Sequence, residues 1–511
     1  MIDREAVRSN AKYLRQVRPI DPDEISDYVP EQPHPAVVRQ VLREEARDLG
    51  LVETDDGRFV PVDDDPIPHR AWSPRAFPER YASALEDLLV ERYGPDWHRG
   101  ESGAALRAAI RELKVDYFAG ESVSYDDRVA AAYAVYHLPD YYAAMGYVLD
   151  TLAERGLLSR RLRVLDVGAG TGGPALGLHD YCFGVGNATD PRSAVIDYHA
   201  VEPSAASDIL EHMLAETTRN FRTTIHETAI ESFEPPNGLL ESTTDEQTEN
   251  EKAEGVTTED EKPENAPASF DLICFGNVLN ELADPVATVE RALDWLADDG
   301  TLCALEPADR EAATELREIE RTVVDRGADA VTVYAPTLRL WEHAEPDGRC
   351  WSFDVRPDLS VPRFQRQLDD AQRDSNDTDP GAFVNVDLQF AYSLLRTDGE
   401  RRFPFRASRT RHASMATMDD HVTRRINLLA VKLSHNLSDD GNPLFLVGDG
   451  SQRVDHYAVL TRESGLNRDL LDAPYGAVIE FENVLVLWND DEAAYNLVVD
   501  AETVVESLSG H

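Results

Sequence analysis

A short apolar strand followed at once by a glycine-rich turn constrains this chain more than any other stretch. Residues 164–167 supply the apolar run typical of a buried parallel strand, and the next six residues, 168–173, include four glycines. Glycine has no Cβ, so it permits a sharp turn and a close approach of a ligand to the main chain. Residues 175–181 can then form a helix whose first N–H groups face the turn. This order predicts a doubly wound α/β domain with a nucleotide at the turn, and an ordinary strand-to-helix turn is the alternative.

Two residues indicate which nucleotide the turn would hold. Asp166 precedes the first glycine, and Thr171 lies inside the turn. The run 166–172, Asp-Val-Gly-Ala-Gly-Thr-Gly, resembles the first motif of class I S-adenosylmethionine-dependent methyltransferases, whose cofactor carries no phosphate. A dinucleotide-binding fold, which places a pyrophosphate at the helix N-terminus, is the alternative. The resemblance implies that S-adenosylmethionine contacts Asp166, Gly168, Ala169, Gly170, Thr171 and Gly172.

The second strand adds an acidic residue to this predicted site. Residues 196–201 form the strand, which ends at Glu202 and Pro203. An acidic residue at this strand end accepts hydrogen bonds from the ribose hydroxyls of adenosine cofactors, and a solvated strand end is the alternative. The spacing from Gly168 exceeds the usual ~20 residues, which an inserted loop at 182–194 explains.

The remaining strands of the sheet are predicted at residues 223–227, 270–275 and 301–305. Asn277 and Val278 follow the second of these. Open parallel sheets bind ligands at the carboxyl ends of their strands. We therefore add Glu202, Pro203, Asn277 and Val278 to the predicted cofactor site.

A helical region, residues 76–157, precedes the sheet. Pro139 is predicted to divide its last stretch, residues 125–152, into two helices. Several tyrosines in that stretch fall on one stripe. Such a stripe usually belongs to the core, and contact with a ligand is the alternative.

The charge of the chain is unusual. It has 511 residues, with 96 acidic against 50 basic side chains and a formal net charge of −46. Five of the basic residues are lysines. A lysine-poor, acidic surface indicates a halophilic protein from a cytosol of very high salt, where screening suppresses self-repulsion. The same bias dilutes any basic signature, so net charge does not exclude an RNA partner.

Length and apolar content bound the architecture. A chain of 511 residues predicts two to four domains. No apolar run reaches the roughly 18 residues of a membrane span, and the N-terminus lacks a secretory h-region. These observations predict a soluble cytoplasmic protein without a membrane partner.

Two segments lie outside the predicted sheet and its helices. Residues 34–62 read as a helix followed by a hairpin at Asp56-Gly57, which is half of a winged-helix module or else an accessory cap. Residues 237–268 carry ten acidic residues and two lysines with little apolar content. This composition predicts a disordered insertion, solvated by default and able to bind a basic partner.

A more specific resemblance rests on the segments 125–133, 137–144 and 277–282. Together with the glycine motif they resemble the methyltransferase-like family of mitochondrial small-ribosomal-subunit assembly factors and their prokaryotic relatives, over residues 120–400. The resemblance implies S-adenosylmethionine binding and work on the small ribosomal subunit or its RNA. Family members also carry a cysteine cluster that holds iron–sulfur. The matching stretch, 345–353, retains Cys350 alone, so we predict no metal.

No catalytic residue is evident from the sequence. Cys274 lies inside an apolar strand, where packing is its expected role. The chain lacks the Asn-Pro-Pro-Tyr motif of many base methyltransferases after the strand at 270–275. The domain could therefore bind its cofactor without using it.

The C-terminal region is predicted to be rich in strands and to contact RNA. After Phe383, apolar residues begin to recur at every second position, as in a strand. Five short strands fall between 427 and 499 in a pattern that resembles an OB-fold. A small barrel used for packing is the alternative. Seven arginines precede or begin these strands, with aromatic residues among them, and are predicted to bind RNA unless they pair with neighbouring carboxylates. They are Arg401, Arg402, Arg406, Arg409, Arg411, Arg424 and Arg425.

The sequence thus predicts an α/β protein with a Rossmann-like methyltransferase sheet at 158–400. An accessory region at 1–75 and the helices of 76–157 precede it, and an OB-like domain at 401–511 follows. The leading hypothesis is a methyltransferase that acts on small-subunit ribosomal RNA. A non-catalytic RNA-binding assembly factor and a small-molecule methyltransferase are the alternatives, and DNA is not expected as a partner.

Overall fold

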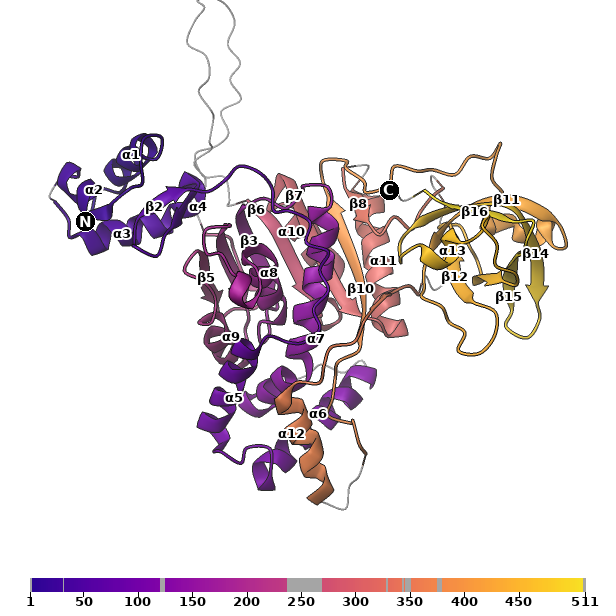
Figure 1. Cartoon of the computed structure of the whole chain (residues 1–511), viewed down its shortest axis with the longest axis horizontal. Coiled ribbons are helices and arrows are strands. Elements are labelled where there is room, and N and C mark those ends of the chain that lie inside the picture. The colour runs from indigo at the N-terminus through magenta and orange to yellow at the C-terminus, as the bar shows by residue number, and fades with distance from the viewer. Residues whose placement is uncertain are drawn as a thin grey trace, which may run out of the picture.

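The chain forms an N-terminal helical module, a central α/β domain and a C-terminal barrel (Figure 1). The computed structural model describes residues 2–30, 32–119, 125–236, 269–327, 330–341, 344, 351–374 and 379–508. The predicted acidic insertion at 237–268 and the cysteine at position 350 lie outside the described residues. None of the described helices is long and apolar enough to cross a membrane.

An eight-stranded sheet forms the centre of the molecule, in the order β5-β4-β3-β6-β7-β10-β8, with β9 also paired to β10. The first five strands are parallel, and β10 runs antiparallel to both β7 and β8. This is the predicted Rossmann-like methyltransferase sheet. Its strands are β3 (Arg161–Val167), β4 (Val195–Val201), β5 (Phe221–His226), β6 (Phe270–Gly276), β7 (Leu296–Pro307), β8 (Thr332–Ala335), β9 (Asp354–Arg356) and β10 (Leu388–Arg396).

Helices cover both faces of the sheet, so its strands are buried on two sides. On β3, Leu162 and Val164 join one hydrophobic core while Leu165 and Val167 join the other, as the two-residue period of a strand requires. The first face carries α7 (Asp127–Ala153), α8 (Gly173–Phe183) and α9 (Ala206–Leu214). The second carries α10 (Pro285–Leu293) and α11 (Arg310–Arg326).

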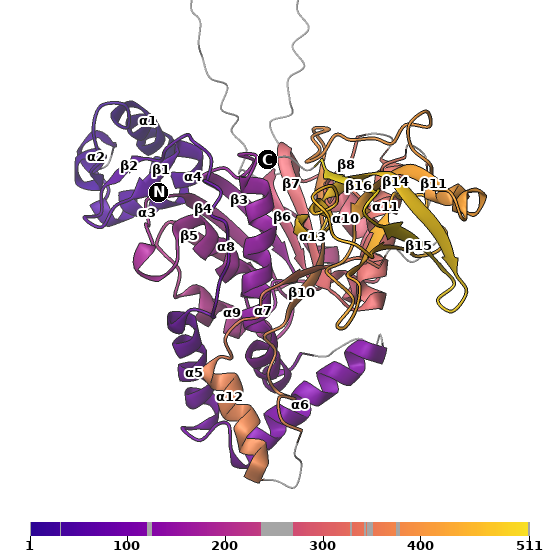
Figure 2. The ribbon, with the colours of Figure 1, turned by 45° about the vertical axis from the view of Figure 1, so that its right-hand side comes forward.

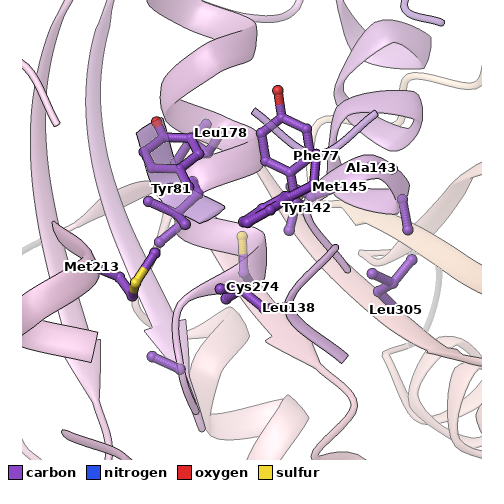
Figure 3. Packing of buried hydrophobic residues seen from close by; sticks show 14 of the residues in the cluster. Phe77, Tyr81, Leu138, Tyr142, Ala143, Met145, Leu178, Met213, Cys274 and Leu305 are labelled. Atoms are coloured by element: carbon purple, nitrogen blue, oxygen red, sulfur yellow. The ribbon is translucent and has the colours of Figure 1, made fainter. Parts of the chain in front are cut away.

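The first core is built largely from α7. Figure 3 shows Leu138 and Tyr142 of this helix packed among side chains from the segment before it and from the sheet, Tyr81 and Cys274 among them. Cys274 is buried beside Cys303 on the neighbouring strand, so its packing role is confirmed.

The predicted break at Pro139 is wrong, because α7 is one helix from Asp127 to Ala153 with Pro139 inside it. A proline in a helix removes the N–H that would bond the carbonyl four residues earlier. Here that carbonyl belongs to Val135, and the side-chain amide of the buried Gln365 donates to it at 2.9 Å. The tertiary contact replaces the missing helical bond.

Three helices form a lobe at the carboxyl edge of the sheet, below it in Figure 1. They are α5 (Glu79–Tyr93), α6 (Gly100–Ala119) and α12 (Arg363–Asp370). Arg363 of α12 donates to Glu86 of α5 at 2.8 Å, which joins segments 277 residues apart in the sequence.

The N-terminal module has the element order of a winged helix. Its elements are α1 (Arg4–Leu14), α2 (Pro22–Tyr28), α3 (Pro35–Glu44), α4 (Ala46–Leu49), β1 (Leu51–Glu53) and β2 (Phe59–Pro61). The two strands form the predicted hairpin, and Ile20 adds a bridge to Phe59. Arg47 donates to Asp271 at 2.6 Å and Arg163 to Asp48 at 3.2 Å, so the module is anchored at the amino ends of the strands, away from the glycine turn that follows β3.

The C-terminal barrel closes on itself in the order β11-β12-β13-β15-β14 and back to β11. The pairing of β13 with β15 is parallel, and the other pairings are antiparallel. A short helix lies between β13 and β14 in the chain. This is OB-like topology, as predicted. The elements are β11 (Arg425–Lys432), β12 (Leu444–Gly448), β13 (His456–Leu460), α13 (Asp469–Asp472), β14 (Val478–Asn489), β15 (Ala494–Val499) and β16 (Val504–Ser507), the last an unpredicted strand paired with β14.

The barrel lies beside the β8 and α11 end of the central domain (Figure 2). Leu340 donates its backbone N–H to the Asp449 carbonyl at 2.9 Å, and the Trp341 indole donates to the Asp449 carboxylate at 2.7 Å. In a further contact between the barrel and the central domain, the Tyr475 hydroxyl lies 3.1 Å from Ser352 Oγ. These polar contacts attach the barrel to the sheet domain.

Candidate functional site

The glycine turn after β3 is left-handed at three positions, where only glycine is unstrained. The φ angles are +66° at Gly168, +54° at Gly170 and +94° at Gly172. A Cβ on Gly168 would lie 2.5 Å from Val278 Cγ2, so the turn packs directly on the residue after β6. The Gly168 N–H donates to the carbonyl of Val201 at the end of β4, at 2.9 Å. Three strand ends therefore meet at this turn.

Glu202 is held rigidly at the end of β4. Its Oε2 accepts the Gly170 N–H at 2.8 Å, and its Oε1 accepts the Ser204 N–H at 2.9 Å. The residue is 6% exposed, so the alternative of a solvated strand end does not hold. A fixed carboxylate at this place is suited to accept hydrogen bonds from ribose hydroxyls.

A cavity of about 470 Å³ opens over the turn. Of the predicted cofactor residues, Gly168, Gly170, Glu202, Pro203, Asn277 and Val278 line it. Ala169, Thr171 and Gly172 support the turn without lining the cavity, as does Asp166. Burial raises the pKa of Asp166 to about 7, and the Tyr198 hydroxyl donates to its carboxyl at 2.5 Å.

Sequence reasoning missed several residues of this cavity. Ala229, Ile230 and Glu231 follow the end of β5, and the rule that ligands gather at the carboxyl ends of strands would have included them. Tyr125 and Tyr133 reach the cavity from the α7 segment, where no pattern in the sequence indicates which tyrosines face the sheet edge.

A second cavity of about 420 Å³ adjoins the first. The two share Tyr125, Tyr133, Asn277 and Glu281 in their walls. The helical lobe, the end of β7 and the start of β10 complete the second cavity. The two cavities are therefore neighbouring compartments at the carboxyl edge of one sheet.

Aromatic rings from α7 line the second cavity. Tyr133, His137 and Tyr141 recur every four residues and so share one helix face. The His137 ring stacks on Tyr141 with centroids 5.1 Å apart and lies 4.9 Å from the Tyr133 ring. By contrast, Tyr142 lies in the core. Part of the tyrosine stripe therefore belongs to the core, as expected, and part of it lines a cavity where a ligand could lie.

Two carboxyl groups lie among these rings, the buried Glu306 and Glu281 at an exposed position of the wall. Desolvation in the cavity wall raises the pKa of Glu281 to about 7, and its Oε1 accepts the Tyr125 hydroxyl at 3.0 Å. Burial also raises the pKa of Glu306 to about 8, although the backbone amides of Leu279 and Val278 act in the opposite direction. No sequence pattern indicates Glu306, which lies near the end of an apolar strand.

A polar cluster holds His137 in place. His137 Nδ1 lies 3.3 Å from Asp140 Oδ2, and Asn385 donates to the same carboxylate oxygen at 2.8 Å. The residues come from α7 and from the segment before β10, so the lobe side of the cavity is cross-linked by side chains.

The seven predicted RNA-binding arginines have different environments. Arg402 pairs with Glu154 at 2.6 Å, Arg411 with Glu480 at 2.8 Å and Arg425 with Asp500 at 2.5 Å. The ion-pair alternative therefore describes these three. Arg401 is half-buried, and three others are exposed beside the barrel: Arg406, Arg409 and Arg424.

Comparison with known families agrees with this geometry. Residues 130–360 match the family described as a methyltransferase domain. The chain contains a methyltransferase domain. The cofactor predicted from the sequence, S-adenosylmethionine, is the one that this domain indicates. The flanking residues match the N-terminal domain (4–55) and the C-terminal domain (416–508) of a domain of unknown function, DUF8157.

Solved structures that resemble the methyltransferase domain are distant. The plantazolicin methyltransferase BpumL, in complex with an analogue and SAH, is 11% identical, with 58% of this chain and 99% of that one covered and a TM-score of 0.29. The mitomycin 7-O-methyltransferase MmcR is 14% identical, with 63% and 80% covered and a TM-score of 0.24. An S-adenosylmethionine-dependent methyltransferase from Clostridium acetobutylicum ATCC 824 is 13% identical, with 33% of this chain and 51% of that one covered and a TM-score of 0.20. Among curated proteins, none matches the chain.

Proposed function

We propose that this protein transfers a methyl group from S-adenosylmethionine to RNA of the small ribosomal subunit. The observation that carries the proposal is the shared wall of the two cavities, at Tyr125, Tyr133, Asn277 and Glu281. A methyltransferase needs a cofactor compartment and an acceptor compartment that meet where the methyl group passes. The first cavity is suited to the cofactor and the second to the acceptor.

The residues around the first cavity fit S-adenosylmethionine. Glu202 presents a fixed carboxylate for ribose hydroxyls, and the open main chain at Gly168 and Gly170 admits a close ligand. Ile230 and Leu282 add apolar surface for an adenine ring. When bound, the cofactor supplies an electrophilic methyl group. The volume, about 470 Å³, is within the usual range for a ligand of this class.

The second cavity suits a planar acceptor. Tyr133, Tyr136, Tyr141 and Phe390 offer ring faces on which a nucleobase can stack. The helical lobe covers this cavity from one side, which limits the access of water. Glu281 and Glu306 lie in the cavity wall and, above their raised pKa values of about 7 and about 8, can accept a proton from the acceptor.

The barrel and the arginines beside it support RNA as the substrate. OB-like barrels hold single strands with exposed aromatic residues, and Phe405 and Trp488 are 36% and 39% exposed here. The resemblance of residues 120–400 to ribosome assembly factors favours the small subunit over other RNA.

Transfer of tritium-labelled methyl groups from S-adenosylmethionine to purified small-subunit RNA, in molar salt, tests the proposal. We expect label in the RNA with the full chain. A Tyr133→Ala variant should lose most transfer, since this ring borders both cavities, while Tyr13→Ala, at an exposed site on α1, should not. Cofactor and RNA binding without transfer would support the non-catalytic assembly factor instead. Transfer to small molecules alone would support a small-molecule methyltransferase.

A further inference from the structure

Two buried oxygen atoms of residues that line the second cavity have no hydrogen-bond partner among the described residues. They are Glu306 Oε2 and Asn277 Oδ1. Glu306 is 3% exposed, and its other oxygen accepts the Leu279 N–H at 3.1 Å. Buried polar atoms of native proteins are nearly always paired, so an unpaired acceptor inside a cavity points to a ligand that donates to it.

The two acceptors lie on neighbouring strands. Asn277 follows β6, Glu306 lies near the end of β7, and the Asn277 N–H donates to the carbonyl of Leu305 at 2.8 Å. The φ angle of Asn277 is +59°, which is uncommon for a residue other than glycine. Its amide nitrogen lies 3.4 Å from the Tyr133 hydroxyl, which leaves Oδ1 as the unpaired atom. The backbone thus holds the amide beside the shared wall.

The charge of the cavity also favours a donor. Five carboxyl groups and one ammonium, that of Lys114, line it. The Lys114 ammonium donates to the carbonyl of Ala382 at 2.7 Å and lies 4.3 Å from the centre of the Tyr136 ring. The carboxyl groups are those of Asp140, Glu281, Glu306, Asp309 and Asp387. A phosphate or carboxylate would be repelled here, whereas an N–H group would be held.

We propose that the acceptor atom is the nitrogen of an amino group on a planar heteroaromatic ring, with Glu306 and Asn277 accepting its N–H groups. The ring stacks among Tyr133, His137 and Tyr141, and the amino group reaches the wall that the two cavities share. This inference rests on the proposed methyl transfer. Adenine and cytosine are the RNA bases that carry such a group.

The reaction balances with these residues. The nitrogen lone pair forms the new C–N bond as the S–C bond of the cofactor breaks, and the sulfur keeps that bonding pair. One N–H proton passes to Glu306, which is a carboxylate above its raised pKa of about 8. Asn277 accepts the second N–H and keeps the nitrogen oriented. The products are a secondary amine on the ring, a neutral thioether and a protonated Glu306.

Matched nucleosides test the inference by binding. The full chain, saturated with S-adenosylhomocysteine in molar salt at about pH 9, where Glu306 is ionised, is titrated in a calorimeter with adenosine and inosine and with cytidine and uridine. Each pair exchanges an amino group for a carbonyl oxygen, which reverses a donor to an acceptor. We expect the amino member of one pair to bind about tenfold or more tightly than its partner. The pair that shows the preference identifies the ring as a purine or a pyrimidine.

Two variants test whether Glu306 causes the preference for the amino nucleoside. Glu306→Gln should reduce the affinity ratio towards one, while the affinity for S-adenosylhomocysteine, which shows that the variant is folded, stays unchanged. Asp387→Asn makes the same change of charge at an exposed position of the cavity wall and should keep the ratio. Equal binding within both pairs, or no binding of any nucleoside, overturns the inference but not the proposed function. Failure to bind S-adenosylhomocysteine would instead overturn the proposed function. A methyl group found on oxygen or carbon of the RNA would also overturn the inference.

Discussion

The side-chain amide of Gln365 donates to the carbonyl of Val135 at 2.9 Å, four residues before Pro139. The same amide lies 3.1 Å from the carbonyl of Tyr136, and the Gln365 carbonyl accepts the Asn385 N–H at 3.1 Å. One buried glutamine therefore completes α7 across its proline and joins that helix to the segment before β10. Because Tyr133, His137 and Tyr141 flank this point, the geometry of the second cavity depends on it.

We expect Gln365→Leu to lower the free energy of unfolding by about 2 kcal/mol or more, because it leaves buried carbonyl groups unpaired. The Pro139→Ala substitution restores an N–H that can bond the Val135 carbonyl. In that background Gln365→Leu should cost about 1 kcal/mol less. Denaturant unfolding of the four proteins of this cycle measures the difference. Strict additivity would contradict the pairing of Gln365 with the proline site.

The glycine turn gives a prediction with an internal control. Gly168 and Gly186 have φ angles of +66° and +58°, but a Cβ would lie 2.5 Å from Val278 at Gly168 and would meet nothing within 4 Å at Gly186. Alanine at either position bears the same backbone strain. We expect Gly168→Ala to weaken S-adenosylmethionine binding about tenfold or more by displacing Val278 from the cavity wall. Gly186→Ala should leave calorimetric affinity unchanged, and equal loss in both would refute the role of the clash.

Much of the cofactor cavity follows from local sequence. An apolar strand, a left-handed glycine turn and strand ends at Glu202 and Asn277 are adjacent in the chain or fixed by the parallel sheet. The closed barrel was also expected, since short strands recur between residues 427 and 499 in an OB-like pattern. These features depend on residue type and spacing, which a single sequence records.

The second cavity could not be predicted in the same way. Its walls join α6, α7, β7 and the segment before β10, so they depend on tertiary packing. Pro139 shows why, because its local preference to break a helix is overridden by Gln365, a residue 226 positions later. Glu306 lies in an apolar strand, and only the folded structure shows that one of its oxygens has no partner among the described residues.

Glu306 should also make the free energy of unfolding depend on pH. Burial raises its pKa from 4.5 to about 8, so the folded protein keeps a proton that the unfolded chain releases. Stability must then fall as the pH rises from about 4.5 to about 8. In Glu306→Gln this contribution is absent. We expect the variant to gain on the order of a few kcal/mol relative to the parent between pH 5 and about pH 9.

Denaturant unfolding at the two pH values measures this gain. Glu281 and Asp166, whose pKa values are also raised by burial, are present in both proteins and cancel in the comparison. A difference between parent and variant that is independent of pH would show that Glu306 is not protonated in the folded state.

The cysteine content predicts a protein without an iron–sulfur cluster. Cys182, Cys274 and Cys303 are buried in the sheet domain, and Cys350 lies outside the described residues. One thiolate in the stretch 345–353 is too few for a cluster that takes four ligands. Protein purified without oxygen should show no absorbance near about 400 nm. Stoichiometric iron and sulfide in such a preparation would overturn the prediction.

The last prediction concerns the arginines beside the barrel. Arg406, Arg409 and Arg424 are exposed in the segment that leads into the barrel, so we expect them to contact RNA. In molar salt the Debye length is about 3 Å, and counterion release adds little to affinity. Any loss of binding must then come from direct contacts, in which the arginine guanidinium donates two hydrogen bonds to a phosphate or stacks on a base.

We expect the triple change of these exposed arginines to serine to weaken binding of small-subunit RNA about tenfold or more, with S-adenosylmethionine affinity unchanged. A control triple change at Arg58, Arg192 and Arg326 alters net charge equally at sites 53–64% exposed in the N-terminal module and central domain. Fluorescence anisotropy with a labelled fragment of that RNA compares the two. Since screening removes long-range effects, the control should bind as the parent does. Equal weakening in both proteins would mean that the barrel arginines act through net charge, and no weakening in either would assign the barrel to packing or to a protein partner.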